Sequence, residues 1–554
     1  MLRIYSFLFV LLLACNVSAA SLPPKAAIAT AHPVATAAGF EILDAGGNAF
    51  DAAVAVSATL AVVEPYSSGI GGGGFWLLHR ASDGKQVMID GRETAPLAAT
   101  RDMYLDEAGK VIPGLSVDGI LAAGIPGEPA ALVHLATHYG RLPLSRSLAP
   151  AIRAAREGFA VTPHYQRMAQ FRLAALQASP AAAAVFLLNN AVPPLGHLIR
   201  QPDLANTLQT LAEQGRAGFY NGAVARRLLR GIKAVGGIWT ARDFQHYQII
   251  ERAPITGRYR NYRIISAPPP SSGGVALVTM LNILERYRLD HMTLLQRQQV
   301  VVEAMRRAYR DRAEYLGDPD YVTIPVTQLT DKTYARKLQR TIDLRRATPS
   351  KTLGQSVDIS GGNHTTHFSI LDKEGNRVAA TLSINYPFGS GFMPPGTGVL
   401  LNDEMDDFSA KPGVPNVYGL VGAEANAIAP GKRMLSSMSP TFVEGQEGVA
   451  ILGTPGGSRI ISMVLQGILA YTEGKDANMI VSQPRYHHQY LPDTIFYESG
   501  AITKHNVNLL QTMGQHLKEL QRRYGNMQVV IWNKQSDTVS AASDPRGEGQ
   551  ARVQ

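Results

Sequence analysis

The chain has little of what marks several protein classes. Its only cysteine is Cys15, so a disulfide framework is excluded. Lys and Arg number 53 against 44 Asp and Glu, a small surplus for 554 residues. Short basic runs such as Arg306-Arg307 and Arg345-Arg346 are typical of solvated helix faces, so we expect no nucleic-acid partner. After residue 20 no apolar run approaches 18 residues, and we expect no membrane span.

Signals for a metal are also weak. His487 and His488 are adjacent and point apart, His364 and His367 have no third ligand nearby, and no H-E-x-x-H occurs. We therefore expect neither a metal nor another cofactor. What the sequence does have is 45% apolar and 18% charged residues, as in a globular protein.

Residues 1–20 have the pattern of an export signal. Arg3 precedes an apolar run over residues 7–13, and Val17-Ser18-Ala19 ends in small side chains. We predict a signal peptide and a periplasmic or secreted location. Leu12-Leu13-Ala14-Cys15 also resembles a bacterial lipobox, so a lipid anchor on Cys15 is an alternative.

Residues 365–385 predict a β-hairpin with chemistry at its open end. Apolar and polar residues alternate on both sides of a turn over residues 372–376. If Leu371 pairs with Arg377, Thr365 lies opposite Ser383, and such partners are about 5 Å apart at Cβ. A threonine that begins a strand beside a second hydroxyl is a candidate nucleophile, especially if its own amine becomes the base. An ordinary half-buried strand fits the same pattern.

Two glycine-rich turns have different interpretations. The run over residues 69–74 matches G-x-G-x-x-G, but it follows a predicted helix (50–63) and precedes a strand (75–79), the reverse of a dinucleotide site. We interpret it as close backbone packing. Residues 449–471 read as strand, turn and helix, so the Gly456 and Gly457 amides could face an oxyanion. A tight structural turn is the alternative.

Other polar clusters are open to two interpretations. Glu404 and Asp407 are three apart and could hold an ammonium group, or belong to a solvated acidic turn. Ser436-Ser437-Met438-Ser439-Pro440 offers hydroxyls and amides for a carboxylate, although Ser-rich turns are common. Residues 259–266 read as a single strand. Residues 331–363 are polar and poor in aromatics, and we expect them to be loosely held.

Several motifs in one order closely resemble the gamma-glutamyltransferase (gamma-glutamyltranspeptidase) family, over about residues 27–546. The resemblance is carried by Gly46-Gly47-Asn48-Ala49-Phe50-Asp51-Ala52-Ala53, the glycine run, Asp90-Gly91-Arg92-Glu93-Thr94-Ala95-Pro96, Thr365-Thr366-His367-Phe368-Ser369, Met405-Asp406-Asp407-Phe408, the Ser436 cluster, Gly453-Thr454-Pro455-Gly456-Gly457-Ser458-Arg459 and Pro484-Arg485-Tyr486-His487-His488.

The resemblance implies an α/β N-terminal-nucleophile hydrolase fold, a four-layer αββα sandwich. It implies self-cleavage between His364 and Thr365, giving a large subunit (21–364) and a small subunit (365–554) of one catalytic unit. Thr365 would attack the γ-glutamyl amide of glutathione and other γ-glutamyl compounds, and pass the acyl group to water, an amino acid or a dipeptide.

Roles follow position by position from the resemblance. The Gly456 and Gly457 amides would hold the oxyanion, and Ser383 stands where the family usually has a threonine that touches the nucleophile. The remaining implied roles are α-carboxylate binding by Arg92, Ser436 and Ser437, α-amino binding by Asn385, Glu404 and Asp407, and a gate on a lid loop (411–418) at Tyr418.

Three other functions compete with this one. A cephalosporin acylase would take a glutaryl group, which lacks the α-amino group that Glu404 and Asp407 suit. A poly-γ-glutamate depolymerase would need an open cleft rather than a lid ending at Tyr418. A non-catalytic envelope binding protein would not need Thr365, Ser383 and the paired glycines.

Overall fold

The computed structural model describes residues 22–353 and 365–554. The signal-peptide prediction for residues 1–20, the anchor at Cys15 and the role of His364 fall outside these residues. Within the described residues no helix is both long and apolar enough to cross a bilayer.

Two antiparallel sheets form the centre of the described chain. The first has the strand order β18 (Gln550–Val553), β1 (Ala27–Thr30), β9 (Thr366–Leu371), β10 (Arg377–Ser383), β2 (Gly73–His79), β3 (Gln86–Gly91) and β6 (Ile250–Arg252). The second has the order β17 (Thr538–Ser543), β16 (Gln528–Asn533), β12 (Gly448–Gly453), β11 (Thr441–Gly445), β8 (Tyr262–Ser266) and β7 (Ile255–Tyr259).

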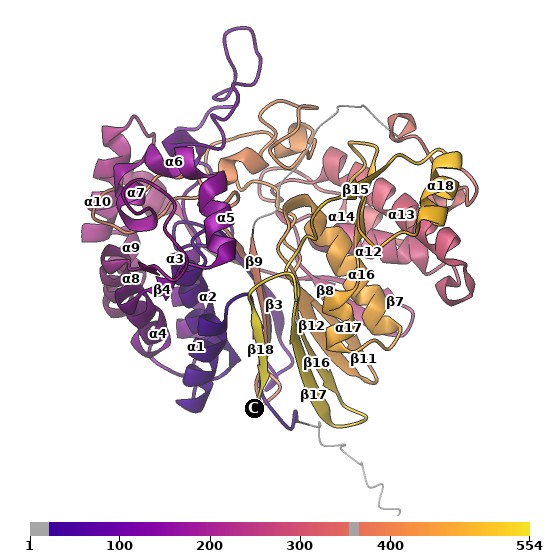
Figure 1. Ribbon diagram of the computed structural model, residues 1–554, viewed down its shortest axis with the longest axis horizontal. Coiled ribbons are helices and arrows are strands. Elements are labelled where there is room, and N and C mark those ends of the chain that lie inside the picture. The colour runs from indigo at the N-terminus through magenta and orange to yellow at the C-terminus, as the bar shows by residue number, and fades with distance from the viewer. Residues whose placement is uncertain (1–21, 354–364) are drawn as a thin grey trace, which may run out of the picture.

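Helices cover the outer face of each sheet (Figure 1). Beside the first sheet lie α1 (Pro33–Asp44), α2 (Ala49–Val63), α3 (Glu128–His138), α4 (Leu144–Glu157), α5 (Pro163–Phe171), α6 (Leu173–Gln177), α7 (Pro180–Phe186), α8 (Pro202–Gln214), α9 (Arg216–Tyr220), α10 (Ala223–Ala234) and α11 (Ala241–His246). Beside the second lie α12 (Gly273–Leu284), α13 (Leu294–Tyr315), α14 (Val326–Leu329), α15 (Lys332–Arg340), α16 (Ile460–Thr472), α17 (Ala477–Ser482) and α18 (Lys504–Thr512). Small sheets add β13 (Tyr486–His487), β14 (Ile495–Glu498) and β15 (Leu517–Leu520), and β4 (Phe159–Ala160) with β5 (Leu198–Ile199). The predicted αββα sandwich is confirmed.

The two-residue period of the strands explains how four layers share two hydrophobic cores. In β2, Trp76 and Leu78 join the core under α1–α4, whereas Phe75 and Leu77 join the core that contains residues of both sheets. Successive side chains on a strand point to opposite faces, so the five central strands β1, β9, β10, β2 and β3 each supply both cores. α2, built mostly from Ala and Val, is buried along its whole length, as its composition predicts.

Three sequence predictions were wrong in detail. Residues 259–266, predicted as one strand, are β7, a tight turn and β8, because Arg260 adopts a φ of 52°. Arg306 and Arg307 are fully buried rather than solvated, and both pair with Glu303 on the same helix. Residues 332–340, predicted to be loosely held, form α15, because the side chain of the preceding residue, Asp331, caps two of its backbone amides.

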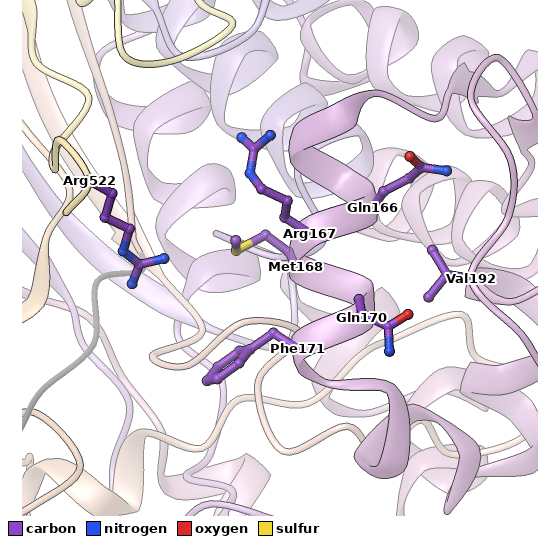
Figure 2. A pocket seen from close by; sticks show the side chains of 7 residues that line it. All are labelled: Gln166, Arg167, Met168, Gln170, Phe171, Val192 and Arg522. Carbon is purple, nitrogen blue, oxygen red and sulfur yellow. The ribbon is translucent and has the colours of Figure 1, made fainter.

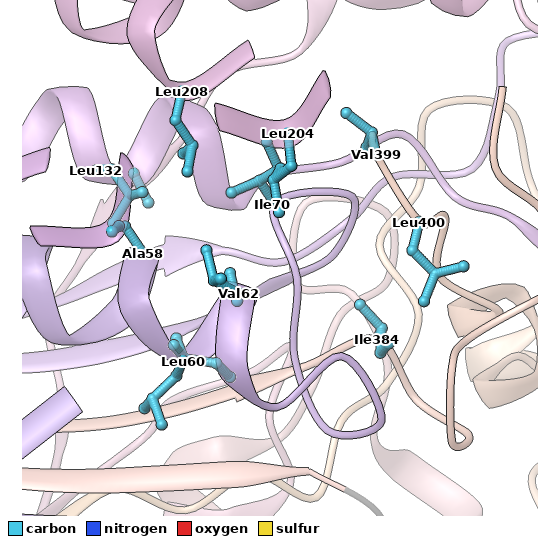
Figure 3. Close-up of a cluster of buried hydrophobic side chains, with 14 of the residues drawn as sticks. Ala58, Leu60, Val62, Ile70, Leu132, Leu204, Leu208, Ile384, Val399 and Leu400 are labelled. Carbon is cyan, nitrogen blue, oxygen red and sulfur yellow. The ribbon is translucent and has the colours of Figure 1, made fainter. Parts of the chain in front are cut away.

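The glycine run brings the backbone of β2 close to the end of β10. A Cβ on Gly72 would lie 2.2 Å from the Ser383 carbonyl oxygen, so no larger residue fits there. The run follows α2 and enters an antiparallel strand, which confirms close packing and not a nucleotide site. Val62, Ile70, Ile384 and Leu400 belong to the same buried cluster (Figure 3), which fixes the segment after Ser383 against α2.

Candidate active site

Thr365 lies immediately before β9, the strand between β1 and β10. The ladder pairs Leu371 with Arg377 and Thr366 with Leu382, the register that the sequence predicts. One further step places Thr365 opposite Ser383, and the two line one cavity. The hairpin thus positions two hydroxyl side chains at the open end of the sheet, both almost fully buried.

The residues that follow Thr365 anchor it firmly. The Thr366 hydroxyl donates to Glu64 Oε2 at 2.7 Å, which ties the start of β9 to the end of α2. His367 Nδ1 lies 2.9 Å from Thr381 Oγ1, and its Nε2 lies 3.2 Å from Ser369 Oγ. Burial lowers the pKa of His367 to about 3, so the ring is neutral. His367 is therefore buried and held by two hydroxyl groups, and so low a pKa makes it a weak base.

Gly456 and Gly457 flank Thr365 from the second half of the chain. Gly457 lines the same cavity as Thr365 and Ser383, and Gly456 lines a neighbouring cavity with Thr365. Both glycines have positive φ, 145° and 53°, in the turn that leads into α16. A Cβ on Gly457 would lie 2.6 Å from the Tyr418 ring. Position 457 therefore requires glycine for two reasons, the positive φ and the lack of space for a side chain.

Arg92 is the centre of a buried ionic cluster. Its guanidinium donates to Asp407 Oδ2 at 2.5 Å and to Glu404 Oε2, and Glu93 lies 3.5 Å away. Arg92 and Glu404 are each 1% exposed, and Asp407 is 12% exposed. Because 312 residues separate Arg92 from Glu404, the sequence alone did not indicate that they pair directly.

The cluster holds more acids than one guanidinium can neutralise. Burial raises the pKa of Glu404 to about 7, and Arg92 opposes that shift. Burial likewise raises the pKa of Glu93 well above its usual value, and it also raises the pKa of Asp407. A charged carboxylate is unfavourable in a low dielectric unless it is paired, so burial opposes ionisation of all three acids at once. Of the three acids, Glu93 is the one whose protonated form burial favours most.

The serine turn lies against the same cavity and is supported from α13. Ser436 Oγ accepts from the Met438 backbone N–H at 3.1 Å. Ser437 Oγ accepts from Arg312 Nη2 at 3.4 Å, and Arg312 Nε donates to Ser272 Oγ at 3.1 Å. Arg312 is buried, so a second guanidinium stands behind the serines.

Asn385 and Tyr418 close the cavity. Asn385 adopts a φ of 72°, which asparagine tolerates, and its side chain donates to the Asp403 carbonyl oxygen at 3.0 Å. The Tyr418 hydroxyl donates to the Asn385 carbonyl oxygen at 2.8 Å, and the side chain is 3% exposed. In this closed arrangement the cavity has a volume of about 20 Å³. That is room for about one water molecule.

The structure therefore brings almost all predicted site residues together. One cavity is lined by Arg92, Thr365, Ser383, Asn385, Glu404, Asp407, Tyr418, Ser436, Ser437 and Gly457. Sequence reasoning missed Glu93, Arg312 and Glu64. Glu93 lies inside a quoted motif and could have been found there. Arg312 and Glu64 gave no signal, because their partners are distant in sequence.

The architecture and the placement of Thr365 define the class of the protein. Two stacked antiparallel sheets between helical layers, with a threonine immediately before a central strand and beside paired glycines, are the N-terminal-nucleophile hydrolase fold. The gamma-glutamyltranspeptidase profile matches residues 35–554, so the chain belongs to the gamma-glutamyltranspeptidase family and is an enzyme of that type.

Individual proteins agree with this assignment. The chain is 44% identical to the glutathione hydrolase proenzyme of Pseudomonas sp. strain A14, over 90% of this chain and 88% of that one. It is 41% identical to the glutathione hydrolase proenzyme of Escherichia coli K12, over 94% and 90%. The cephalosporin acylase structure from Bacillus halodurans superposes with a TM-score of 0.84 at 26% identity and covers 100% of this chain and 99% of that one.

Proposed function

We propose that the chain is a glutathione hydrolase and γ-glutamyltransferase whose nucleophile is Thr365, freed by cleavage after His364. The proposal rests on one observation: Thr365 lines the same buried cavity as a guanidinium, two carboxylates and Gly457 of the glycine turn. This set matches the groups of a γ-glutamyl amide: an α-carboxylate, an α-amino group and a reacting carbonyl.

The proposed reaction has two steps. The Thr365 hydroxyl loses its proton to its own α-amine and attacks the γ-carbonyl, which forms an oxyanion held by the Gly456 and Gly457 amides. The C–N bond breaks, the leaving amine takes the proton, and a γ-glutamyl ester remains on Thr365. Water or an acceptor amine then attacks the ester, the C–O bond to Thr365 breaks, and the hydroxyl regains a proton.

Donor binding in this proposal exchanges ion pairs. Arg92 pairs with Glu404 and Asp407 in the closed cavity, which is too small for a γ-glutamyl group. The donor's α-carboxylate would replace the acids on Arg92, with Ser436 and Ser437 as further donors. Its ammonium would replace Arg92 on the acids, with Asn385 beside them. Every buried charge keeps a partner throughout, which avoids the cost of leaving one unpaired.

The α-amino group separates this function from that of a glutaryl acylase. The Bacillus halodurans structure is that of a cephalosporin acylase. We expect the processed protein to hydrolyse γ-glutamyl-4-nitroanilide at least about tenfold faster than glutaryl-4-nitroanilide, because the glutaryl group leaves Glu404 and Asp407 without a cation. The two kcat/KM values measure this. Faster turnover of the glutaryl compound would favour the acylase, and turnover of neither would favour a binding protein.

The pKa of Glu404 gives the proposal a pH signature. Because that pKa is about 7, Glu404 is mostly protonated below neutral pH and then attracts the donor's ammonium less. We expect KM for γ-glutamyl-4-nitroanilide to rise severalfold between pH 8 and pH 6. In Glu404→Gln, which keeps the shape but cannot titrate, the rise should flatten, with a higher KM at pH 8. An unchanged KM profile in that variant would remove Glu404 from donor binding.

We further propose that two subunits, residues 21–364 and 365–554, stay together after cleavage, and that the enzyme is exported. Strands from both sides of the cut alternate in the first sheet: β1 pairs with β9 and β18, and β10 pairs with β2. Separation of the subunits would expose both hydrophobic cores. The pattern of residues 1–20 supports export.

A further inference from the structure

Thr365 stands between two cavities of different character. On one side is the small cavity with Arg92 and Gly457. On the other side Thr365 and Gly456 line a cavity of about 480 Å³, together with Tyr66 and the segment around Arg522. A third cavity of about 670 Å³ lies along α5, and it shares Arg167, Met168 and Arg522 with the second. The second and third cavities are therefore adjacent, and we call the two together the outer cavity.

The outer cavity is basic where its two parts join. Arg167 on α5 and Arg522 on the segment before β16 line the same cavity from opposite sides (Figure 2). Arg523 lines the part nearer Thr365. All three are exposed, and none forms an ion pair with a carboxylate in the part of the chain that the structure describes. Arg546, a fourth arginine there, is already paired with Glu498 and Asp544.

Two acidic residues line the outer cavity, and Glu548 Oε2 is buried without a hydrogen-bond partner among the described residues. Glu64 accepts from the Thr366 hydroxyl, and burial raises its pKa to about 7, so it is about half protonated at neutral pH. Glu548 Oε1 accepts from the His164 backbone N–H at 3.3 Å. Arg167 Nη2 lies 3.1 Å from His164 Nδ1, and since a guanidinium can only donate, that nitrogen is the acceptor. The contact orients Arg167 without neutralising its charge.

We propose that the outer cavity binds the peptide half of the substrates, and that Arg167 and Arg522 hold the carboxylate at its end. This rests on the proposed function. If the γ-glutamyl half occupies the cavity beside Gly457, the amine side of the scissile amide points past Gly456 into the outer cavity. In glutathione the leaving half is a dipeptide whose one remaining acid is its terminal carboxylate. An acceptor dipeptide has the same chemistry and enters from the same side.

The walls suit such a ligand. Tyr66 and Met168 line the part near Thr365, and Phe171 lines the outer part, so side chains of a short peptide find apolar surface. Arginine is well matched to a carboxylate because its planar fork donates two parallel hydrogen bonds. Recognition by charge at the far end leaves the peptide's side chains little specified, so we expect tolerance for many dipeptides.

The test uses two donors that differ by one carboxylate, γ-glutamyl-4-nitroanilide and γ-glutamyl-3-carboxy-4-nitroanilide, with the processed enzyme. In the double variant Arg167→Gln/Arg522→Gln we expect kcat/KM for the carboxylated donor to fall about three- to tenfold, as for two partly exposed ion pairs. The uncarboxylated donor should change less than about twofold. Transfer to glycylglycine should weaken as the carboxylated donor does, whereas transfer to glycylglycine amide should not.

Arg258→Gln, an exposed arginine on β7 outside both large cavities, is the matched control and should change none of the four rates. Equal losses for both donors, or no change in either donor or in transfer, would overturn the inference. If only transfer changes, the site serves acceptors and the leaving-group role is wrong. Failure of the unmutated enzyme to hydrolyse the uncarboxylated donor contradicts the proposed function itself, so the two failures are distinguishable.

Discussion

Thr365→Ala is expected to leave a single uncut chain without γ-glutamyl hydrolysis. The substitution removes the one hydroxyl that attacks both the preceding peptide bond and the donor, so both reactions are lost together. Loss of a covalent nucleophile costs at least about 10⁴-fold in rate. A denaturing gel and a γ-glutamyl-4-nitroanilide assay measure the two effects separately.

Two controls make this result specific. Thr365→Ser keeps the hydroxyl, so we expect two bands and reduced but measurable activity. Thr366→Ala removes only the hydrogen bond to Glu64, and we expect that variant to be cut. Two bands from Thr365→Ala would show that another residue or a protease makes the cut. Turnover by its uncut chain would show that Thr365 is not the nucleophile.

Arg92→Gln should have the second-largest effect, because it removes a cation from among three buried acids. Truncating one partner of a buried charge pair costs about 2–5 kcal/mol in binding, so kcat/KM for γ-glutamyl donors should fall about 30-fold or more. Breaking a buried ion pair also costs about 3–5 kcal/mol of folding stability. Activity and thermal unfolding together measure both losses.

The stability loss should depend on pH in a defined direction. In the variant, Glu404 and Asp407 lack Arg92, so their folded pKa values, already raised by burial, rise further above the unfolded ones. The folded state then holds protons that the unfolded state has lost, and stability falls as pH rises above about 4.5. The deficit in Tm should therefore be larger at pH 8 than at pH 6. Arg92→Lys keeps a charge and should recover part of the Tm but little of the donor binding. An Arg92→Gln protein with normal Tm and KM would contradict the cluster's role.

Local rules were enough to predict much of the scaffold and the nucleophile's neighbour. The opposition of Thr365 and Ser383 followed from two-residue alternation and a turn ending at Gly375, which has a φ of 88°. The register is set within 20 residues of chain, so no distant contact is needed to fix it. The burial of α2 and the close packing of the glycine run were also predicted correctly, because their composition alone indicates tight packing.

What escaped prediction depends on partners far apart in sequence. Arg306 looked like a surface residue, but it donates to Gln515 Oε1, 209 positions away, as well as pairing with Glu303. Arg312 gave no sign of reaching Ser437 from α13. The positive φ of Arg260 divides the predicted single strand into a hairpin, although no glycine or proline indicates a turn there. The direct pairing of Arg92 with the acids, rather than separate roles for each, also needed the folded arrangement.

The most direct test is the intact mass and amino-terminal sequence of both pieces of the mature protein. We predict two polypeptides that co-purify and together account for a 59.7 kDa precursor less its leader, the smaller beginning at Thr365 with an unblocked amine. A single polypeptide that nevertheless hydrolyses γ-glutamyl-4-nitroanilide, or a small piece beginning at any other residue, would contradict a threonine that activates its own hydroxyl.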